Sequence, residues 1–260
     1  MAKNTPPKNQ PTGREALRQR QQAAATADRR VSIAIRTAWI AGLAVAALLI
    51  GVTTWSIVGA RTDTTGVVAA DGLVAPRTAT DSGAVLIGKP DAKVTVTVFL
   101  DFLCPYCGQF ERANGSALAA AIASGTAKVE VHPMSFLDDL SSGTKYSTRA
   151  ANAFVAVANN NPATALAFSQ LLFAQQPAEN SAGLTDATIA EMASQAGAPA
   201  EVVAGFGKLT FQPWVAKITQ QAFDSGITGT PTIKINGQTF TGDLYTAGPL
   251  AEAITAAANG

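Results

Sequence analysis

The chain has 260 residues, enough for one large domain or two small ones, and its formal net charge is +1. Residues 1–36 carry eight Lys or Arg against two acidic residues, whereas residues 61–260 carry eleven against sixteen. A nucleic-acid-binding arm is disfavoured, because the basic segment leads directly into an uncharged hydrophobic stretch. Both cysteines lie in one Cys-X-X-Cys motif, which excludes a framework of disulfides spread over the chain.

The first 60 residues predict a tail and a membrane segment. Residues 1–36, rich in Gln, Ala, Pro and basic side chains, favour a disordered cytoplasmic tail. Residues 37–60 are uncharged, and a helix of that length, about 36 Å, would cross the roughly 30 Å core of a bilayer. The positive-inside rule then places the rest of the chain outside the cytoplasm. The rival interpretation is a signal peptide cleaved after residues 58–60, but the apolar run is longer than such peptides usually have.

The next elements lead to the cysteines. Residues 61–83 are interpreted as a linker, residues 84–88 as a short first strand and residues 88–92 as a turn. Residues 94–100 alternate valine with threonine and then become wholly apolar, which predicts a strand covered on both faces. From residue 108 onward, apolar side chains recur at helical spacing.

The motif Cys104-Pro105-Tyr106-Cys107 therefore lies where a buried strand becomes a helix. A disulfide over so short a loop would contribute less than about 2 kcal/mol, so a purely structural role explains it poorly. A structural zinc site needs four ligands, and His132 is the single histidine of the chain. The placement indicates redox chemistry of the two thiols, with no metal and no cofactor.

The rest of the chain completes an α/β pattern. Residues 128–137 predict a strand parallel to the first, joined to it by a right-handed helical crossover. Residues 139–226 contain four to five amphipathic runs and no convincing strand, which predicts an all-helical insertion. Residues 232–241 form a hairpin pattern around an Asn-Gly pair, and residues 250–258 predict a closing helix.

Three segments resemble the DsbA-like thioredoxin-fold oxidoreductases, in particular the membrane-anchored or secreted bacterial kind. They are Gly88-Lys-Pro-Asp-Ala92, Phe99-Leu-Asp-Phe-Leu-Cys-Pro-Tyr-Cys107 and Gly229-Thr-Pro-Thr-Ile233. The resemblance covers about residues 84–260 and implies a thioredoxin fold with a helical insertion. It also implies that Thr230–Pro231 is a cis peptide packed against the dithiol.

The position of each cysteine predicts its role. Cys104 would lie at a helix N-terminus, where backbone amides and the helix dipole lower a thiol pKa, and it would be the exposed nucleophile. Cys107, one turn further, would be the more buried resolving thiol. The backbone of Thr230 would pair with an extended substrate beside Pro231, as in strand addition.

The chain departs from the pattern of the strongest oxidants at two positions. Tyr106 stands where strongly oxidising DsbA proteins have histidine, which predicts a milder oxidant. Val98 stands where thioredoxin-fold relatives often have a buried acid six residues before the first cysteine. Asp101 matches the narrower family, and we interpret it as a strand-end or capping carboxylate rather than a proton relay.

Together these observations predict an extracytoplasmic thiol:disulfide oxidoreductase, held in the membrane by one transmembrane helix. It would oxidise exported proteins through Cys104 and Cys107 and be reoxidised by a quinone-linked membrane thiol oxidase. A reductase of the same fold is one alternative, and a non-catalytic chaperone or binding module is another. An isomerase is disfavoured, because nothing on the N-terminal side is large enough to be the added dimerisation domain.

Overall fold

The chain divides into two units, residues 1–61 and residues 62–260, and the computed structural model describes residues 65–260. The predicted tail and membrane segment lie outside the described residues. Among residues 65–260 no helix is both long enough and apolar enough to cross a bilayer.

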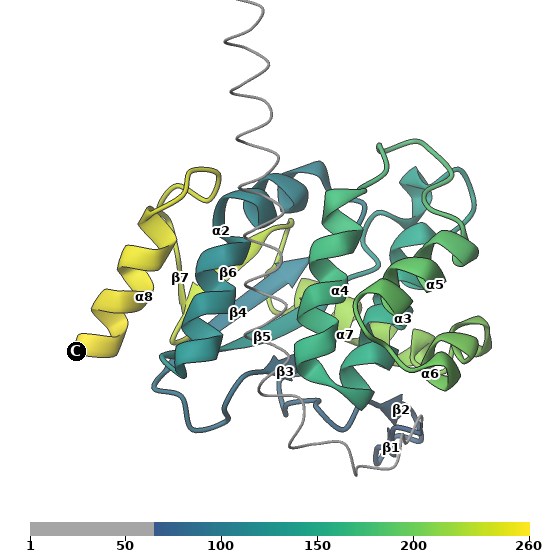
Figure 1. The fold of residues 1–260 in the computed structure, drawn as a ribbon, viewed down its shortest axis with the longest axis horizontal. Helices are drawn as coiled ribbons and strands as arrows, with labels where there is room; N and C mark the ends of the chain where they lie inside the picture. The colour runs from purple at the N-terminus through teal and green to yellow at the C-terminus, as the bar shows by residue number, and fades with distance from the viewer. Residues whose placement is uncertain (1–64) are drawn as a thin grey trace, which may run out of the picture. The chain divides into compact units, whose positions relative to one another are not determined.

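A five-stranded sheet with the order β3-β5-β4-β6-β7 forms the centre of the described unit (Figure 1). Its strands are β3 (Val85–Ile87), β4 (Val94–Leu100), β5 (Ala127–Pro133), β6 (Thr232–Ile235) and β7 (Gln238–Thr239). The predicted parallel pairing is confirmed: β4 and β5 are parallel and joined by α2 (Pro105–Ser124), and the other pairs are antiparallel. Because β4 is the middle strand, both of its faces are covered, as its apolar sequence predicts.

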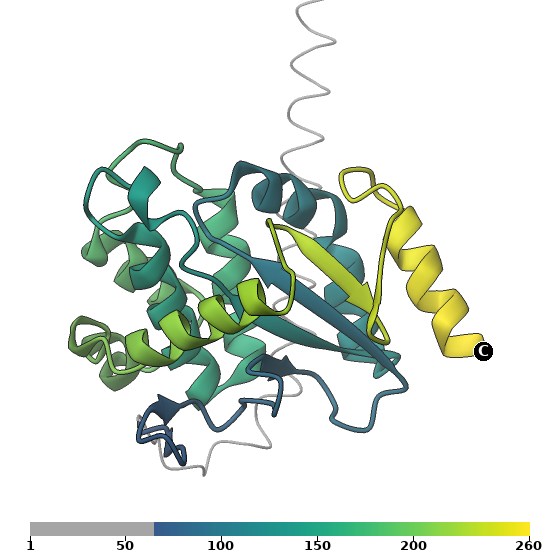
Figure 2. The same ribbon diagram turned by 180° about the vertical axis from the view of Figure 1, so that it is seen from behind.

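The helical insertion follows β5. It contains α3 (Tyr146–Asn160), α4 (Pro162–Ala174), α5 (Asp186–Gln195), α6 (Ala200–Ala204) and α7 (Gln212–Asp224), with short 3₁₀ turns at Asp138–Leu140 and Phe206–Lys208. Between residues 139 and 226 the chain forms no strand, as predicted. Figures 1 and 2 show α2 and α7 on opposite faces of the sheet, and α8 (Pro249–Asn259), the predicted closing helix, contacts α2.

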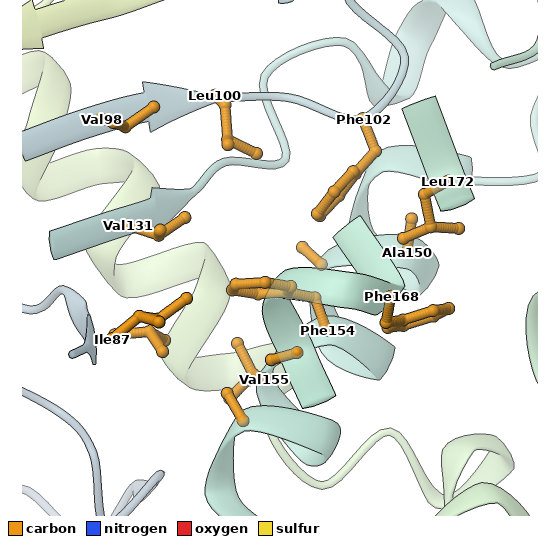
Figure 3. Close-up of a cluster of buried hydrophobic side chains, with 14 of the residues drawn as sticks. Ile87, Val98, Leu100, Phe102, Val131, Ala150, Phe154, Val155, Phe168 and Leu172 are labelled. Carbon is orange, nitrogen blue, oxygen red and sulfur yellow. The ribbon is translucent and has the colours of Figure 1, made fainter. Parts of the chain in front are cut away.

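One continuous apolar core joins the sheet to the insertion (Figure 3). Phe154 of α3 is fully buried and lies with Phe102 and the valines of β4 and β5. The aromatic residues of the insertion belong to this core: Phe154, Phe168 and Phe173 are buried, and the half-buried Phe206 stacks on Phe168. This shared core fixes the helical part against the strands that lead to the cysteines.

Two boundaries differ from the predictions. The strand β5 ends at Pro133 rather than 137, because residue 135 leaves the sheet and its amide bonds Thr219 of α7 instead. The strand β7 ends at Thr239, although the Asn236–Gly237 turn is present with φ values of 48° and 83°, as a type I′ turn requires.

The segment predicted as a linker contains a small hairpin. Its strands are β1 (Val67–Val68) and β2 (Val74–Ala75), which pair with each other in a separate two-stranded sheet. Two-residue strands are too short to give a readable alternation of apolar and polar side chains, so the sequence pattern did not indicate them.

Candidate active site

The two thiols lie at the start of α2, directly after β4. Cys104 is the N-cap residue of α2, and Pro105 occupies the first position of the helix. Both cysteines are free, so the structure is the dithiol form. Cys104 is less buried than Cys107, at 5% against 1% exposed, but the prediction that Cys104 is exposed is wrong, because its thiol packs against the carbonyl oxygen of Thr230. Tyr106 between the two cysteines is 56% exposed.

The Thr230–Pro231 peptide bond is cis, as the resemblance implied. The Cys104 thiol donates a hydrogen bond of 3.2 Å to the carbonyl oxygen of Thr230. These residues meet because β6 begins at Thr232, which pairs with Phe99 of β4. The structure thus brings together all six residues that the sequence marked, Cys104, Pro105, Tyr106, Cys107, Thr230 and Pro231.

Hydrogen bonds lower the pKa of Cys104 to about 6. The largest contribution comes from the Cys107 thiol, and burial opposes it. The backbone amides of Cys107 and Tyr106, in the first turn of α2, also favour the thiolate. The Thr230 hydroxyl, which is buried without a partner in the dithiol form of the described chain, lies where it can turn to donate to the thiolate.

Cys107 behaves in the opposite way. Burial raises its pKa well above the ordinary value, and its hydrogen bond to Cys104 raises it further. The pair therefore holds one ionised sulfur and one protonated sulfur at neutral pH. Thiol–disulfide exchange requires this combination of an attacking thiolate and a second thiol within reach.

Asp101 is fully buried, although the sequence indicated only a strand-end or capping residue. Its Oδ1 accepts from the Leu103 amide at 2.8 Å, as in an Asx turn; the predicted capping role is wrong, because the N-cap of α2 is Cys104 and that helix has no side-chain cap. It also accepts from the hydroxyl of Ser147 on α3 at 2.7 Å, and its Oδ2 accepts from the Leu137 amide at 2.8 Å. Val98 stands where thioredoxin-fold relatives often have a buried acid, and it is a core residue that pairs with Val131 and Ile233.

Gln176, which no sequence pattern indicated, holds the active-site loop. Its Nε2 donates to the carbonyl oxygens of Phe102 at 3.1 Å and Cys104 at 2.8 Å. Gly108 permits this approach, because a Cβ at that position would lie 2.1 Å from the Gln176 Oε1. The helical insertion thereby fixes the chain on either side of Leu103.

A second tyrosine lies beside the motif. The ring of Tyr245 is 6.0 Å from that of Tyr106, and Tyr245 is 47% exposed. Asn114 of α2 donates at 2.8 Å to the carbonyl oxygen of Leu244, which holds the Tyr245 loop against the helix. Nothing in the local sequence of this loop indicated that it would reach the dithiol.

His132 is a packed residue of β5. It is 5% exposed and stacks on Phe99 with ring centroids 4.2 Å apart. Burial and the nearby Lys234 lower its pKa to about 4. It is therefore neutral at physiological pH.

Several known proteins are similar to this chain. A 118-residue segment, 44% of the chain, is 39% identical to part of the serine/threonine-protein kinase PknE of Mycobacterium tuberculosis. That match spans 21% of the kinase, so the chain corresponds to about a fifth of it.

Solved structures match a much larger share of the chain. The reduced disulfide bond oxidoreductase DsbG of M. tuberculosis is 25% identical with a TM-score of 0.57, over 70% of this chain and 97% of that protein. The oxidised DsbA of the same organism is 25% identical with a TM-score of 0.56, over 67% and 99%. BdbD of Bacillus subtilis, at 24% identity and a TM-score of 0.58 over 72% and 98%, shares the fold.

The family comparison agrees with this architecture. A family described as thioredoxin matches residues 80–254, which include both cysteines, the whole helical insertion and the cis-proline. The chain therefore belongs to the thioredoxin family, and its described unit is a thioredoxin fold with a helical insertion.

Proposed function

We propose that this protein is a thiol:disulfide oxidoreductase that acts through Cys104 and Cys107. The observation that carries the proposal is the contact of the Cys104 thiol with Thr230, at the N-terminus of α2 and beside a cis proline. The solved structures that resemble it include the M. tuberculosis proteins described as a disulfide bond oxidoreductase and as DsbA, which supports the same chemistry here.

The reaction can be written from the two sulfurs. In the disulfide form a substrate thiolate attacks Cys104, a mixed disulfide forms, and Cys107 leaves and takes up a proton. A second substrate thiolate then attacks the substrate sulfur, the substrate disulfide forms, and Cys104 leaves as a thiolate. The substrate loses two electrons and the Cys104–Cys107 pair gains them.

The low pKa of Cys104 favours the oxidising direction. A thiolate that is stable at neutral pH is a good leaving group, and it stabilises the reduced protein relative to the disulfide. The exposed Tyr106 and Tyr245 flank this sulfur and offer aromatic surface to an unfolded polypeptide. Reduced exported proteins are therefore the proposed substrates, and the oxidised state would be restored by a quinone-linked membrane thiol oxidase.

The proposed location is the outer face of the cell membrane, with the N-terminus in the cytoplasm. The basic residues of 1–36 and the uncharged residues 37–60 support this orientation. Fusion of a reporter that is active only outside the cytoplasm to residue 260 would give signal if the orientation is right. A signal from a cytoplasm-specific reporter at the same position would contradict it.

The activity is tested with a reduced, unfolded protein that needs disulfides to fold. The oxidised protein should form those disulfides in stoichiometric amounts, and Cys104→Ser should form none. Equal rates for the two proteins would rule out the proposed chemistry. Undiminished refolding assistance by a variant with both cysteines changed to alanine would instead indicate a chaperone or binding module.

A redox titration separates the oxidase from the reductase. Equilibration of the Cys104–Cys107 pair with glutathione buffers should give a potential between roughly −120 and −180 mV. A value near that of thioredoxin, about −270 mV, would assign the protein as a reductase instead.

A further inference from the structure

Asp101 connects three segments that meet behind the dithiol. Its carboxylate accepts hydrogen bonds from Leu103 in the active-site loop, from Leu137 after β5 and from Ser147 on α3. The side chain is fully buried. Within residues 65–260 no basic side chain forms an ion pair with it. An ionised carboxylate in such a place is stabilised by its hydrogen bonds alone, without a neutralising cation.

The main chain of Asp101 also holds both cysteines. Its carbonyl oxygen accepts from the Cys104 amide at 3.1 Å, and its own backbone amide lies near enough to the Cys107 thiol to lower the pKa of that thiol. The Asp101 carboxylate also lies close enough to Cys104 for the two charges to interact. The Asp101 side chain forms no hydrogen bond to either sulfur among the described residues, so it acts on them through its charge and through the loop it holds.

Burial raises the pKa of Asp101 to about 7, although its three hydrogen bonds lower it, and the charge of Cys104 raises it further. The Cys104 thiolate exists only when the pair is reduced. Asp101 consequently binds a proton more readily in the reduced protein than in the disulfide form. By reciprocity, a protonated Asp101 must favour the reduced pair.

Other titratable or charged groups also lie on the segments around Asp101. They include Cys107 and Glu111 on α2, His132 on β5, Asp138 and Asp139 after it, and Lys145, Tyr146 and Arg149 at the start of α3. Tyr146 is buried and Asp101 raises its pKa further above the ordinary value, so it stays neutral. Glu111 has its pKa raised to about 7 by burial and titrates in the same range, which makes it a useful control.

We propose that Asp101 is a positioning residue that takes up a proton when the Cys104–Cys107 disulfide is reduced, so that the reduction potential of the pair rises more steeply, as the pH falls through neutrality, than the proton on Cys107 alone would cause. The inference rests on the proposed redox function of this pair. Two electrons from substrate thiols reduce the disulfide to the Cys104 thiolate and the Cys107 thiol, with one proton taken up by Cys107. A second proton from solvent converts the Asp101 carboxylate to the carboxylic acid.

The direct test follows the carboxyl carbon of Asp101 by NMR in labelled full-length protein, titrated separately in the disulfide and dithiol forms. The expected result is a midpoint at higher pH in the dithiol form. Ser147→Ala removes one donor to the ionised carboxylate but keeps the acid, so both midpoints should move to higher pH. Glu111→Gln should leave the difference between the two forms intact.

The redox potential gives an independent readout. Across the pH range between the two Asp101 midpoints, the wild type should take up more protons per reduction than Asp101→Asn. The asparagine variant should also have a Cys104 pKa below that of the wild type, because a nearby negative charge is gone. In Asp101→Asn the side-chain NH2 group can face the Leu137 N–H, which would place two donors against each other and could prevent folding. If this variant does not fold, the titrations of Ser147→Ala decide the question alone.

The outcomes separate the inference from the function on which it rests. Asp101 midpoints that agree in the disulfide and dithiol forms would overturn the inference while leaving the redox function intact. The same holds for a Ser147→Ala variant whose midpoints do not move. A pair that cannot be cycled between disulfide and dithiol by redox buffers would overturn both.

Discussion

The hydrogen bond from Cys107 is the largest cause of the low pKa of Cys104, and two substitutions isolate it. Cys107→Ala removes the donor, whereas Cys107→Ser keeps a hydroxyl donor of similar size. A hydrogen bond to a charged group contributes about 1.5–3 kcal/mol, or roughly one to two pKa units. We therefore expect the Cys104 pKa to rise from about 6 to about 7–8 in Cys107→Ala and to stay near about 6 in Cys107→Ser.

The change is large enough to measure in two ways. The thiolate-to-thiol ratio of Cys104 at pH 7 should fall from about ten to one to between about one to one and one to ten in the alanine variant. A pH titration of the thiolate absorbance gives the pKa, and the rate of alkylation by iodoacetamide gives the thiolate fraction. The serine variant is the control for the loss of the disulfide itself, since neither variant can form one.

Two results would refute this reasoning. If the Cys104 pKa of Cys107→Ala equals that of the wild type, the amides of the first turn of α2 and the Thr230 hydroxyl are sufficient to lower that pKa without Cys107. An equal rise in both variants would mean that burial of the Cys104 sulfur changed, and not the donated hydrogen bond. Either outcome would also remove the reason for assigning a protonated Cys107 as the partner that stabilises the thiolate.

Three further predictions concern the residues that support the site. Gln176→Ala should lower the free energy of unfolding by about 1–3 kcal/mol and slow disulfide exchange, because two active-site carbonyls lose their donor; the exposed Gln175→Ala is the control, and equal behaviour of the two variants would contradict the role. His132, with a pKa lowered to about 4, stays neutral where the unfolded chain binds a proton, so stability should fall by about 3 kcal/mol as the pH drops from about 6.5 to 4. Urea unfolding of His132→Phe at about pH 6.5 and about pH 4 should show no such loss of stability. A loss of stability that persists in this variant would be assigned to other titratable groups. Phe154→Ala should cost about 3–5 kcal/mol in the same assay, because its ring fills the centre of the core; a cost below about 1 kcal/mol would mean that the core closes over the gap.

The sequence by itself determined the elements whose pattern is local. The alternation of residues 94–100, the helical spacing after Cys107 and the Asn-Gly turn each follow from contacts within a few residues, so they can be read directly. The helical character of residues 139–226 is visible for the same reason. The resemblance added the pairing of the Cys-X-X-Cys motif with Thr230–Pro231, which no local pattern shows.

Tertiary structure alone decided how the dithiol is surrounded. Asp101 looked like a capping residue from its neighbours, and its burial depends on Ser147 of α3, 46 positions further along the chain. Gln176 and Tyr245 reach the site from loops with no motif of their own. Hydrogen bonds and charge interactions act between atoms that are close in space, and the fold brings those atoms together from distant positions. The sequence therefore named the two sulfurs, whereas the packing of the helical insertion set the pKa of the groups around them.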